Sequence, residues 1–446
     1  LASLSLGGFT HIPAVVGSAV ALGVLESAMV AHNRAPSEVS AVMAAVIVLA
    51  LLLRSLLDKA DTRVSSDATS SWLTIDDPSE VPPELRRIPE VVAVRVASAF
   101  VVGGLAFVMP LALDTSNLIK ATAVVIYAII GLSVVVLTGW AGQVSLGQMA
   151  FVAIGAALTA KLSHEWQVDL FVALASCALV GALTAVVVGL PALRQQGLLL
   201  AVTTLGLSLV TTAYLLNDDF WVGAWVHNGR FERLPLFGRI AVDSPLRMYY
   251  LALGVLAAVL VSVRGLRQSR TGRALLAMRE NEAAAQSFGV SPVRVKLTGF
   301  AVSGAVASVA GGLFAYNLRV YSPDEFGPAA SIEVFTMAVV GGLGTVGGAV
   351  LGALYLQGAS WFLPVDWRFL ATGAGVLLVL LVLPSGLAGG LLWLRDRWLR
   401  RVARRRRIIV PSLVADGAEN RPPAGGGSTP RRVGGAVGSW QERGSK

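Results

Sequence analysis

The chain has 446 residues, of which 55% are hydrophobic and 14% charged, and its mean hydropathy is +0.69. So apolar a composition excludes an ordinary water-soluble domain and predicts a membrane protein with several spans. The formal net charge of +9 equals the net charge of the tail that starts at Arg395, so the rest of the chain is neutral and offers no basic surface for nucleic acid.

The sequence lacks the residue patterns of common catalytic and metal sites. Its one cysteine, Cys177, and its four scattered histidines give neither a disulfide framework nor the spacing of metal ligands. No Gly-x-x-x-x-Gly-Lys-[Ser/Thr] loop, Gly-x-Ser-x-Gly elbow or His-Glu-x-x-His motif occurs. We therefore expect no catalytic residue, metal or cofactor, and a protein that is not an enzyme.

The first residues of the chain recur near its end. Residues 6–16 align with residues 340–350, 334 positions later, and each copy is followed by an apolar stretch, a polar break and an apolar run that stops at an arginine. Gly-rich helices also resemble one another by composition alone, but the shared downstream order favours duplication, which is how two-halved membrane transporters are built. We expect residues 1–53 to be the membrane tail of a first transporter half. Because the chain begins at Leu1 rather than Met, we expect it to be part of a longer fusion.

A polar segment at 54–93 separates this tail from the second half. It holds five basic and eight acidic residues and four prolines. Such a composition is typical of a solvated, irregular tether, so we predict a cytoplasmic linker.

The second half, residues 94–394, is predicted to be an all-α polytopic membrane domain with about eight transmembrane helices and one re-entrant segment. Bilayer-length apolar runs must be helical, because the membrane interior leaves backbone groups no other partner. The runs lie at 94–113, 118–137, 147–162, 168–190, 198–216, 248–263, 295–316, 332–356 and 369–387.

Arginine placement orients these runs. Five arginines between 264 and 279, and the cluster after Arg395, mark both segments as cytoplasmic, including the basic, partly disordered tail 395–446. Because both segments are cytoplasmic, the chain between them must cross the membrane an even number of times. Three apolar runs lie there, so the Gly-rich run 332–356 must enter and leave from the outside. We expect the cationic tail to contact anionic membrane lipid rather than nucleic acid, since it follows the last span directly.

The loop 264–294 is the most functional-looking polar segment. Its stretch 273–288 is rich in Ala, Leu, Arg and Glu and predicts one short surface helix of about 24 Å. From the residues alone, an interfacial amphipathic helix and a docking element for another protein remain equally open.

Polar side chains and glycines within the spans mark a candidate substrate path. Gly-rich breaks free backbone groups toward a cavity, and polar side chains at depth offer weak contacts to a passing solute. Helix packing by small residues is the alternative for most of the glycines. The candidates are Gln143, Ser145, Gln148, Thr203, Thr204, Gly341, Gly342 and Gly344.

Three segments together resemble one family. Residues 272–290 contain Gly-Arg-Ala-Leu, then Arg-Glu-Asn-Glu-Ala-Ala-Ala and Phe-Gly-Val; residues 139–146 read Gly-Trp-Ala-Gly-Gln-Val-Ser-Leu; and residues 341–348 read Gly-Gly-Leu-Gly-Thr-Val-Gly-Gly. The stretch from about Tyr127 to Leu387 is similar to branched-chain amino acid ABC permeases of the Liv type. Residues 1–53 resemble the end of the partner permease of the same system.

The resemblance implies an importer permease in the bacterial plasma membrane, multi-pass, with its C-terminus in the cytoplasm. The implied partners are ABC ATPase subunits, an extracytoplasmic solute-binding protein and a small-molecule substrate, a branched-chain or similar amino acid. The loop 264–294 would be the coupling loop that docks on the ATPase, although the glycine after Glu-Ala-Ala falls one position later than in the common importer form. The implied coupling residues are Arg273, Arg279, Glu282, Ala283 and Gly289.

Two alternatives stay open. One is an ABC permease for another small solute, such as a sugar or a urea-like compound. The other is an ion-coupled carrier or channel without an ATPase, which the scarcity of ionisable residues within the spans disfavours.

Overall fold

The computed structural model describes residues 12–32, 88–193, 198–216, 229–230, 243–364 and 370–406, together with Val39, Val42, Val46, Leu85, Arg233 and Trp367. Nearly all of the predicted run at 39–53, most of the linker 54–93 and the tail beyond Arg406 lie outside the described residues. The described part is almost entirely helical, so the prediction of an all-α membrane fold is confirmed.

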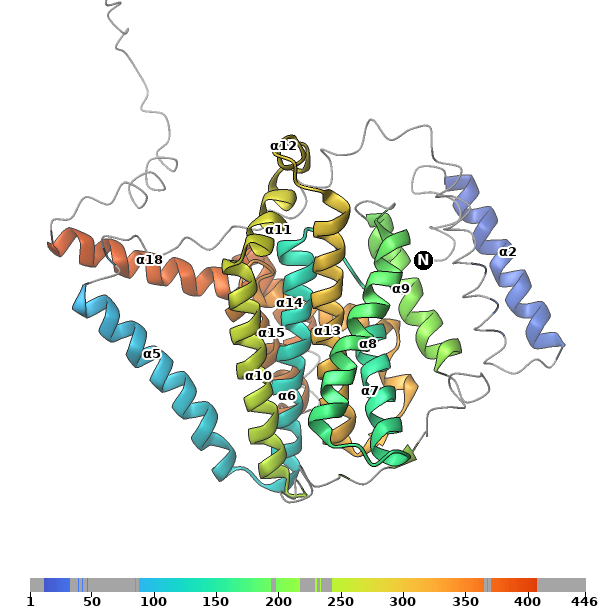
Figure 1. The fold of residues 1–446 in the computed structure, drawn as a ribbon, viewed down its shortest axis with the longest axis horizontal. Helices are drawn as coiled ribbons and strands as arrows, with labels where there is room; N and C mark the ends of the chain where they lie inside the picture. Colours follow the sequence, from blue (N-terminus) through green and yellow to red (C-terminus); the bar gives the residue numbers. More distant parts are fainter. Residues whose placement is uncertain are drawn as a thin grey trace, which may run out of the picture.

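The helices follow the predicted apolar runs in chain order (Figure 1). The elements are α2 (Ile12–Ala31), α5 (Pro89–Val108), η1 (Met109–Ala112), α6 (Thr115–Val134), η2 (Val135–Trp140), α7 (Gln148–His164), α8 (Leu170–Ala192), α9 (Leu198–Val210), η3 (Thr211–Leu215), β1 (Gly229–Arg230), α10 (Pro245–Gln268), α11 (Arg270–Glu280), α12 (Glu282–Ser287), α13 (Pro292–Leu318), β2 (Val320–Tyr321), η4 (Pro323–Phe326), α14 (Pro328–Gly341), α15 (Val346–Phe362), η5 (Leu370–Ala374), α17 (Gly375–Val382) and α18 (Gly386–Arg406).

Five helices in the described residues are long and apolar enough to cross a membrane by themselves. They are α5 with η1, α6 with η2, α8, α10 and α13. The other predicted crossings correspond to shorter helices, namely α7, α9 with η3, and α17 with η5. The chain is thus a multi-pass membrane protein whose helices run between an end that carries α12, here named the α12 end, and the opposite end that carries η4, named the η4 end (Figure 1).

The Gly-rich run, predicted to be re-entrant, forms two helices joined by a sharp bend, here named the hairpin. Helices α14 and α15 change direction by 119° at the break between them. Near the open ends of the two helices, the side chain of Gln357 donates to Glu333 at 2.9 Å, so α14 and α15 start and finish on the same side of the molecule. Gly342, with φ of 110°, ends α14 in a conformation that favours glycine.

Residues 1–11, which hold most of the first copy of the repeat, lie outside the described residues. The assignment of 1–53 to a separate half remains a prediction.

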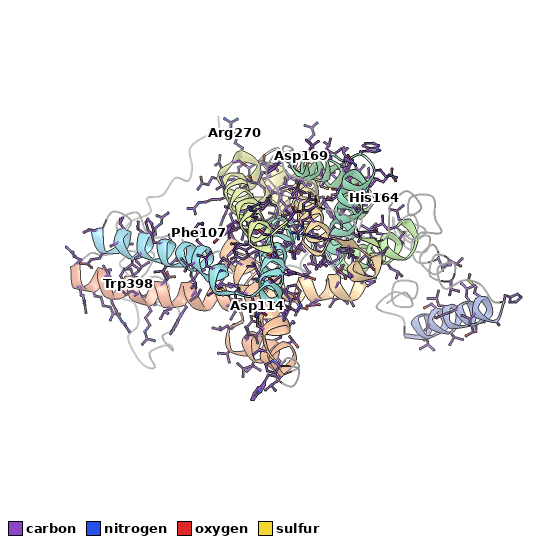
Figure 2. The ribbon with its side chains drawn as sticks, turned by 90° about the horizontal axis from the view of Figure 1, so that it is seen from below. Phe107, Asp114, His164, Asp169, Arg270 and Trp398 are labelled. Atoms are coloured by element: carbon purple, nitrogen blue, oxygen red, sulfur yellow. The ribbon has the colours of Figure 1, made fainter. Side chains whose placement is uncertain are left out.

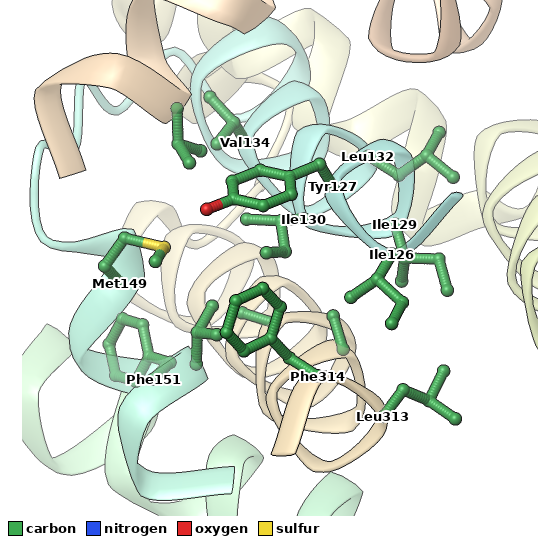
Figure 3. Packing of buried hydrophobic residues seen from close by; sticks show 14 of the residues in the cluster. Ile126, Tyr127, Ile129, Ile130, Leu132, Val134, Met149, Phe151, Leu313 and Phe314 are labelled. Atoms are coloured by element: carbon green, nitrogen blue, oxygen red, sulfur yellow. The ribbon is translucent and has the colours of Figure 1, made fainter. Parts of the chain in front are cut away.

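Helix α13 lies at the centre of the bundle and packs on α6, α7 and α8. Its contact with α7 needs glycine on both helices: a Cβ on Gly155 would lie 1.9 Å from the Ser308 carbonyl oxygen, and a Cβ on Gly311 would lie 1.9 Å from that of Val152. Small residues of this kind let membrane helices approach closely. Figure 3 shows the apolar core that results, with the rings of Tyr127 and Phe314 in edge-to-face contact at 5.9 Å.

Helices α5 and α18 form an arm that projects to one side of the bundle (Figure 2). Only 6% of the apolar window of α5 with η1 is buried, against 94% for α6 with η2. The start of α5 is held by an apolar cluster with α18 that includes Val91 and Val402, and by an ion pair of 2.7 Å between Arg406 and Glu90. Two points differ from the prediction: α5 begins at Pro89, inside the predicted linker, and α18 continues as a helix past Arg395 to Arg406.

The η4 end is tied together by Arg233, whose guanidinium donates to the carbonyl oxygens of Tyr316 and Asn317, each at 2.8 Å. These carbonyls belong to the last turn of α13, where a cation is favourable. Burial, and then the nearby Arg319, lower the pKa of Arg233 to about 10, so it is still charged at neutral pH. The short β1–β2 pair, which joins residues 229–230 to 320–321, closes the same end.

Candidate functional site

The predicted coupling loop forms two helices rather than one. The predicted single helix over 273–288 is broken at Asn281, which has φ of −154° and ψ of 101°. The Asn281 side chain accepts from the Ala284 amide at 2.9 Å and so caps the start of α12. The prediction was wrong here because asparagine favours a capping conformation over a helix interior.

Helix α11 lies on the bundle, whereas α12 extends beyond it and forms the outermost part of the α12 end (Figure 1). Leu275 and Met278 of α11 are buried, at 0% and 4% exposure. After α12, the Phe288 side chain is 87% exposed, and Gly289 follows with φ of 79°. An exposed aromatic ring at the tip of a polar loop is unusual. Phe288 was not among the predicted coupling residues, although the sequence places it beside a glycine in this loop.

The five predicted coupling residues divide into outward and inward groups. Arg273, Ala283 and Gly289 are exposed, and Arg273 donates to the carbonyl of Gln268 at 2.8 Å. In contrast, Arg279 is half-buried and its Nη1 donates to the carbonyl of Gly139 at 2.6 Å. Glu282 is half-buried as well.

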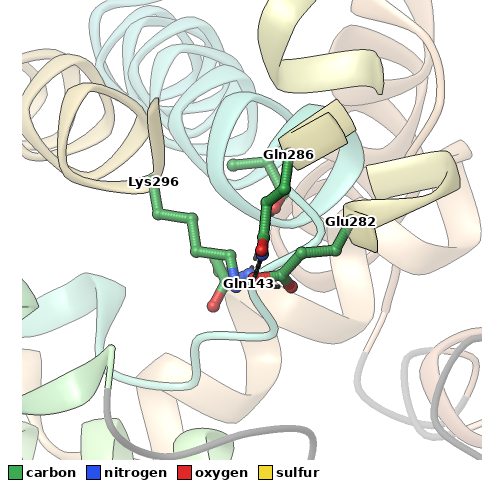
Figure 4. Close-up of polar contacts among 5 residues, drawn as sticks. Gln143, Glu282, Gln286 and Lys296 are labelled. Carbon is green, nitrogen blue, oxygen red and sulfur yellow. Dashed lines mark hydrogen bonds and ion pairs between the residues drawn. The ribbon is translucent and has the colours of Figure 1, made fainter. Parts of the chain in front are cut away.

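Glu282 belongs to a polar cluster at the foot of α12 (Figure 4). Its carboxylate accepts from the Lys296 ammonium at 2.8 Å and from the Gln286 amide at 3.5 Å. Gln143 lies in the same cluster, and its own amide donates to the carbonyl of Ala141 at 3.2 Å. Gln143, predicted for the substrate path, is therefore placed at the α12 end.

The segment 139–147 lies between the coupling loop and the re-entrant hairpin. On one side, the carbonyl of Gly139 accepts a hydrogen bond from Arg279, and the guanidinium of Arg267 lies 5.8 Å from the centre of the Trp140 ring. On the other side, a Cβ on Gly139 would lie 2.0 Å from the carbonyl oxygen of Leu343 in the hairpin turn. A continuous chain of contacts thus joins α11, the end of α6 and the turn of the hairpin.

Gln148, a predicted path residue at the start of α7, holds helices together. The buried Gln148 side chain donates to Ser133 at 2.8 Å and to Ser303 at 2.7 Å, which links α6, α7 and α13. Its Oε1 has no hydrogen-bond partner among the described residues.

Ser145 and Thr204 bind the segment locally. The Ser145 hydroxyl accepts from the Gly147 amide at 3.4 Å, and Thr204 of α9 accepts from the Leu146 amide at 2.9 Å. Thr203, on the neighbouring position of α9, is half-buried.

The glycines of the hairpin turn are closely packed. A Cβ on Gly341 would lie 2.0 Å from the Gly348 carbonyl oxygen, and one on Gly342 would lie 3.0 Å from that of Ser385. Gly344, in the same turn, is buried. These contacts are those of close helix packing, which was the alternative to a cavity for these glycines.

One carboxylate on the hairpin faces outward. Glu333 of α14 is exposed, as is the adjacent Ile332 at 43%. The sequence analysis did not include Glu333 among the path residues; the signal that marks it is its charge within an otherwise apolar run.

Comparison with known proteins agrees with this architecture. A family profile described as "Branched-chain amino acid transport system / permease component" matches residues 117–384. No solved structure matches the chain.

Three relatives illustrate the range of the family. The high-affinity branched-chain amino acid transport system permease protein LivM of Salmonella typhimurium is 31% identical over 307 residues, which cover 64% of this chain and 72% of LivM. LivH of Escherichia coli, another permease protein of that system, is 37% identical over 128 residues, 28% of this chain and 41% of LivH. The autoinducer 2 import system permease protein LsrC of an Enterobacter species is 30% identical over 294 residues, 62% of this chain and 80% of LsrC. The chain belongs to the branched-chain amino acid transport permease family.

Proposed function

We propose that this chain is a membrane-spanning permease subunit of an ABC importer that passes branched-chain or similar amino acids across the bacterial plasma membrane. Separate ATPase subunits would supply the energy, and an extracytoplasmic binding protein would deliver the solute. Family membership and the names of LivM and LivH support the substrate class. The α12 end, the C-terminal tail and α18 would lie on the cytoplasmic side.

The observation that carries the proposal is the shape of the α12 end. Helix α12 projects beyond the bundle, its residue Ala283 is exposed, and Phe288, which follows the helix, is 87% exposed. Large exposed aromatic side chains are frequent anchors of protein interfaces. We assign Phe288 as the anchor that enters a groove of the ATPase subunit, with Arg273 and Ala283 on the surrounding surface.

The inward residues would transmit the movement of the ATPase rather than contact it. Arg279 joins α11 to Gly139 at the end of α6, and Gly139 in turn packs on Leu343 in the hairpin turn. Close-packed contacts of this kind shift together rather than deform. A displacement of α12 would therefore change the position of the hairpin.

The similarity to LsrC, whose name gives autoinducer 2 as the imported solute, supports a second candidate substrate class. A permease for that type of solute would use the same α12 end. The two classes are distinguished by measuring uptake of leucine and of autoinducer 2 in the same reconstituted transporter.

Replacing Phe288 by Ala tests the docking role. The transporter would be reconstituted with its ATPase subunits and binding protein, and co-purification of the ATPase and leucine uptake would be measured. We expect at least a tenfold loss of both, because truncating an interface anchor costs on the order of 2 kcal/mol or more. The matched control is Phe362→Ala, the last residue of α15, which is 41% exposed and lies outside the loop 264–294, so it should leave ATPase binding unchanged. Unchanged ATPase binding by Phe288→Ala would contradict the proposed docking site.

A further inference from the structure

The outer half of the re-entrant hairpin carries a charge that neither the helix packing nor the α12 end accounts for. Glu333 lies five residues after Pro328, the first residue of α14, and so about 7–8 Å along the helix from its start. Ser331, Val334, Met337 and Ala338 face the protein interior and are buried, whereas Ile332 and Glu333 are exposed. The carboxylate thus lies on the open face of a helix within the membrane domain.

A carboxylate at such a position is costly unless it has polar partners or water. Within the described residues, no lysine or arginine forms an ion pair with Glu333. Its hydrogen-bond partner is the amide of Gln357, which is 2% exposed and donates to Oε1 at 2.9 Å. An uncharged donor fixes the orientation of the carboxylate without neutralising it.

The surroundings suit an organic cation. Trp361 lies one helical turn after Gln357 on α15, is half-buried, and its ring packs edge-to-face on Tyr127 at 5.8 Å. An aromatic ring one helical turn from the residue that holds the carboxylate would add cation–π attraction for an ammonium group. Ile332, next to Glu333 on α14, is exposed and adds an apolar side chain.

We propose that Glu333 binds the ammonium group of the amino-acid substrate as the substrate enters the permease from the η4 end, with Gln357 holding the carboxylate in place. This inference rests on the proposed importer function and deepens it. The site recognises a feature that all amino acids share, so it would select for the ammonium group and not for the side chain.

Glu333→Gln tests the proposal because it removes the charge and keeps a similar shape and a polar contact for Gln357. The full transporter, with ATPase subunits and binding protein, would be reconstituted in proteoliposomes and supplied with leucine. We expect leucine uptake per transporter molecule to fall about tenfold or more, the effect of losing one charge-assisted hydrogen bond. Membrane abundance should be unchanged, and Glu333→Asp, which keeps the charge, should recover part of the uptake.

The matched control is Glu325→Gln, which removes another exposed carboxylate at the η4 end but outside the hairpin. Its uptake should stay within about twofold of the unmodified protein. If Glu333→Gln transports leucine normally, or if both glutamate variants lose uptake equally, the assignment of Glu333 is overturned. If the unmodified transporter itself carries no leucine, the proposed substrate class fails instead.

A second measurement does not depend on the folding of a glutamate variant. Ile332→Cys, in a background in which the buried Cys177 is replaced by Ala, places a thiol next to the carboxylate. We expect leucine-loaded binding protein to slow the reaction of this thiol with a positively charged methanethiosulfonate reagent in the reconstituted transporter. No slowing by leucine would overturn the site.

Discussion

The charged groups of the α12 end and of the hairpin have different partners. At the α12 end, charged side chains have partners within the chain: Arg279 binds the carbonyl of Gly139, and Glu282 pairs with Lys296 at 2.8 Å. At the outer half of the hairpin, Glu333 has a neutral amide as its partner and stays exposed. In our proposals, the paired charges at the α12 end hold and move parts of the protein, whereas the charge on the hairpin is available to a passing solute.

The junction between the two regions gives the largest expected effect. Gly139→Ala would place a Cβ 2.0 Å from the carbonyl oxygen of Leu343, so the end of α6 and the hairpin turn would have to separate. Overpacking of this kind costs about 1–3 kcal/mol or more, and we expect leucine uptake to fall at least tenfold. Gly104→Ala on α5 is the control, since nothing lies within 4 Å of its Cβ position. Equal uptake by the two variants would show that the Gly139 contact does not transmit movement.

The division of the coupling loop into inward and outward arginines is tested next. Arg279→Ala removes a charge-assisted hydrogen bond to the carbonyl of the buried Gly139, an interaction of about 1.5–3 kcal/mol, so we expect roughly a tenfold loss of leucine transported per ATP hydrolysed. Arg273→Ala removes an exposed arginine from the same helix and should change this ratio by less than about threefold. The quantity to measure is the ratio of uptake to ATPase activity. The inward role is excluded if Arg273→Ala has the larger effect.

The smallest effects are expected at two glutamines near the junction, and they should differ in kind. Gln148→Leu removes the amide that joins Ser133 and Ser303, at a cost of about 1–3 kcal/mol, and should lower membrane abundance and thermal stability. Gln143→Leu, at a half-buried position, should leave abundance normal and lower uptake per molecule about fivefold if Gln143 contacts the solute. Normal specific uptake by Gln143→Leu would remove this residue from the substrate path and leave Glu333 as the polar contact to examine.

The order of the helices was predicted from the sequence and is confirmed. The re-entrant path of residues 332–356 and the coupling role of the loop 264–294 remain predictions. Hydropathy and arginine placement are local properties, and a membrane leaves an apolar run of bilayer length only one stable form. The hairpin at 332–356 followed from counting crossings between two arginine clusters, and the structure has the bend in the same run. The break at Asn281 was not predicted. The composition of the whole stretch favours a helix, whereas the cap that ends one helix and starts the next depends on only a few residues.

The roles of individual polar residues were decided by the tertiary structure alone. Arg273 and Arg279 belong to the same short stretch of sequence, yet one is exposed and the other reaches Gly139, 140 positions earlier in the chain. Likewise, Gln148 is buried between serines of two other helices, whereas Glu333 faces outward beside a buried amide from α15. Sequence determined which segments enter the membrane because that depends on the transfer of each segment from water to lipid. Which polar group is paired and which is free depends on the helix that lies opposite, and only the packed structure contains that information.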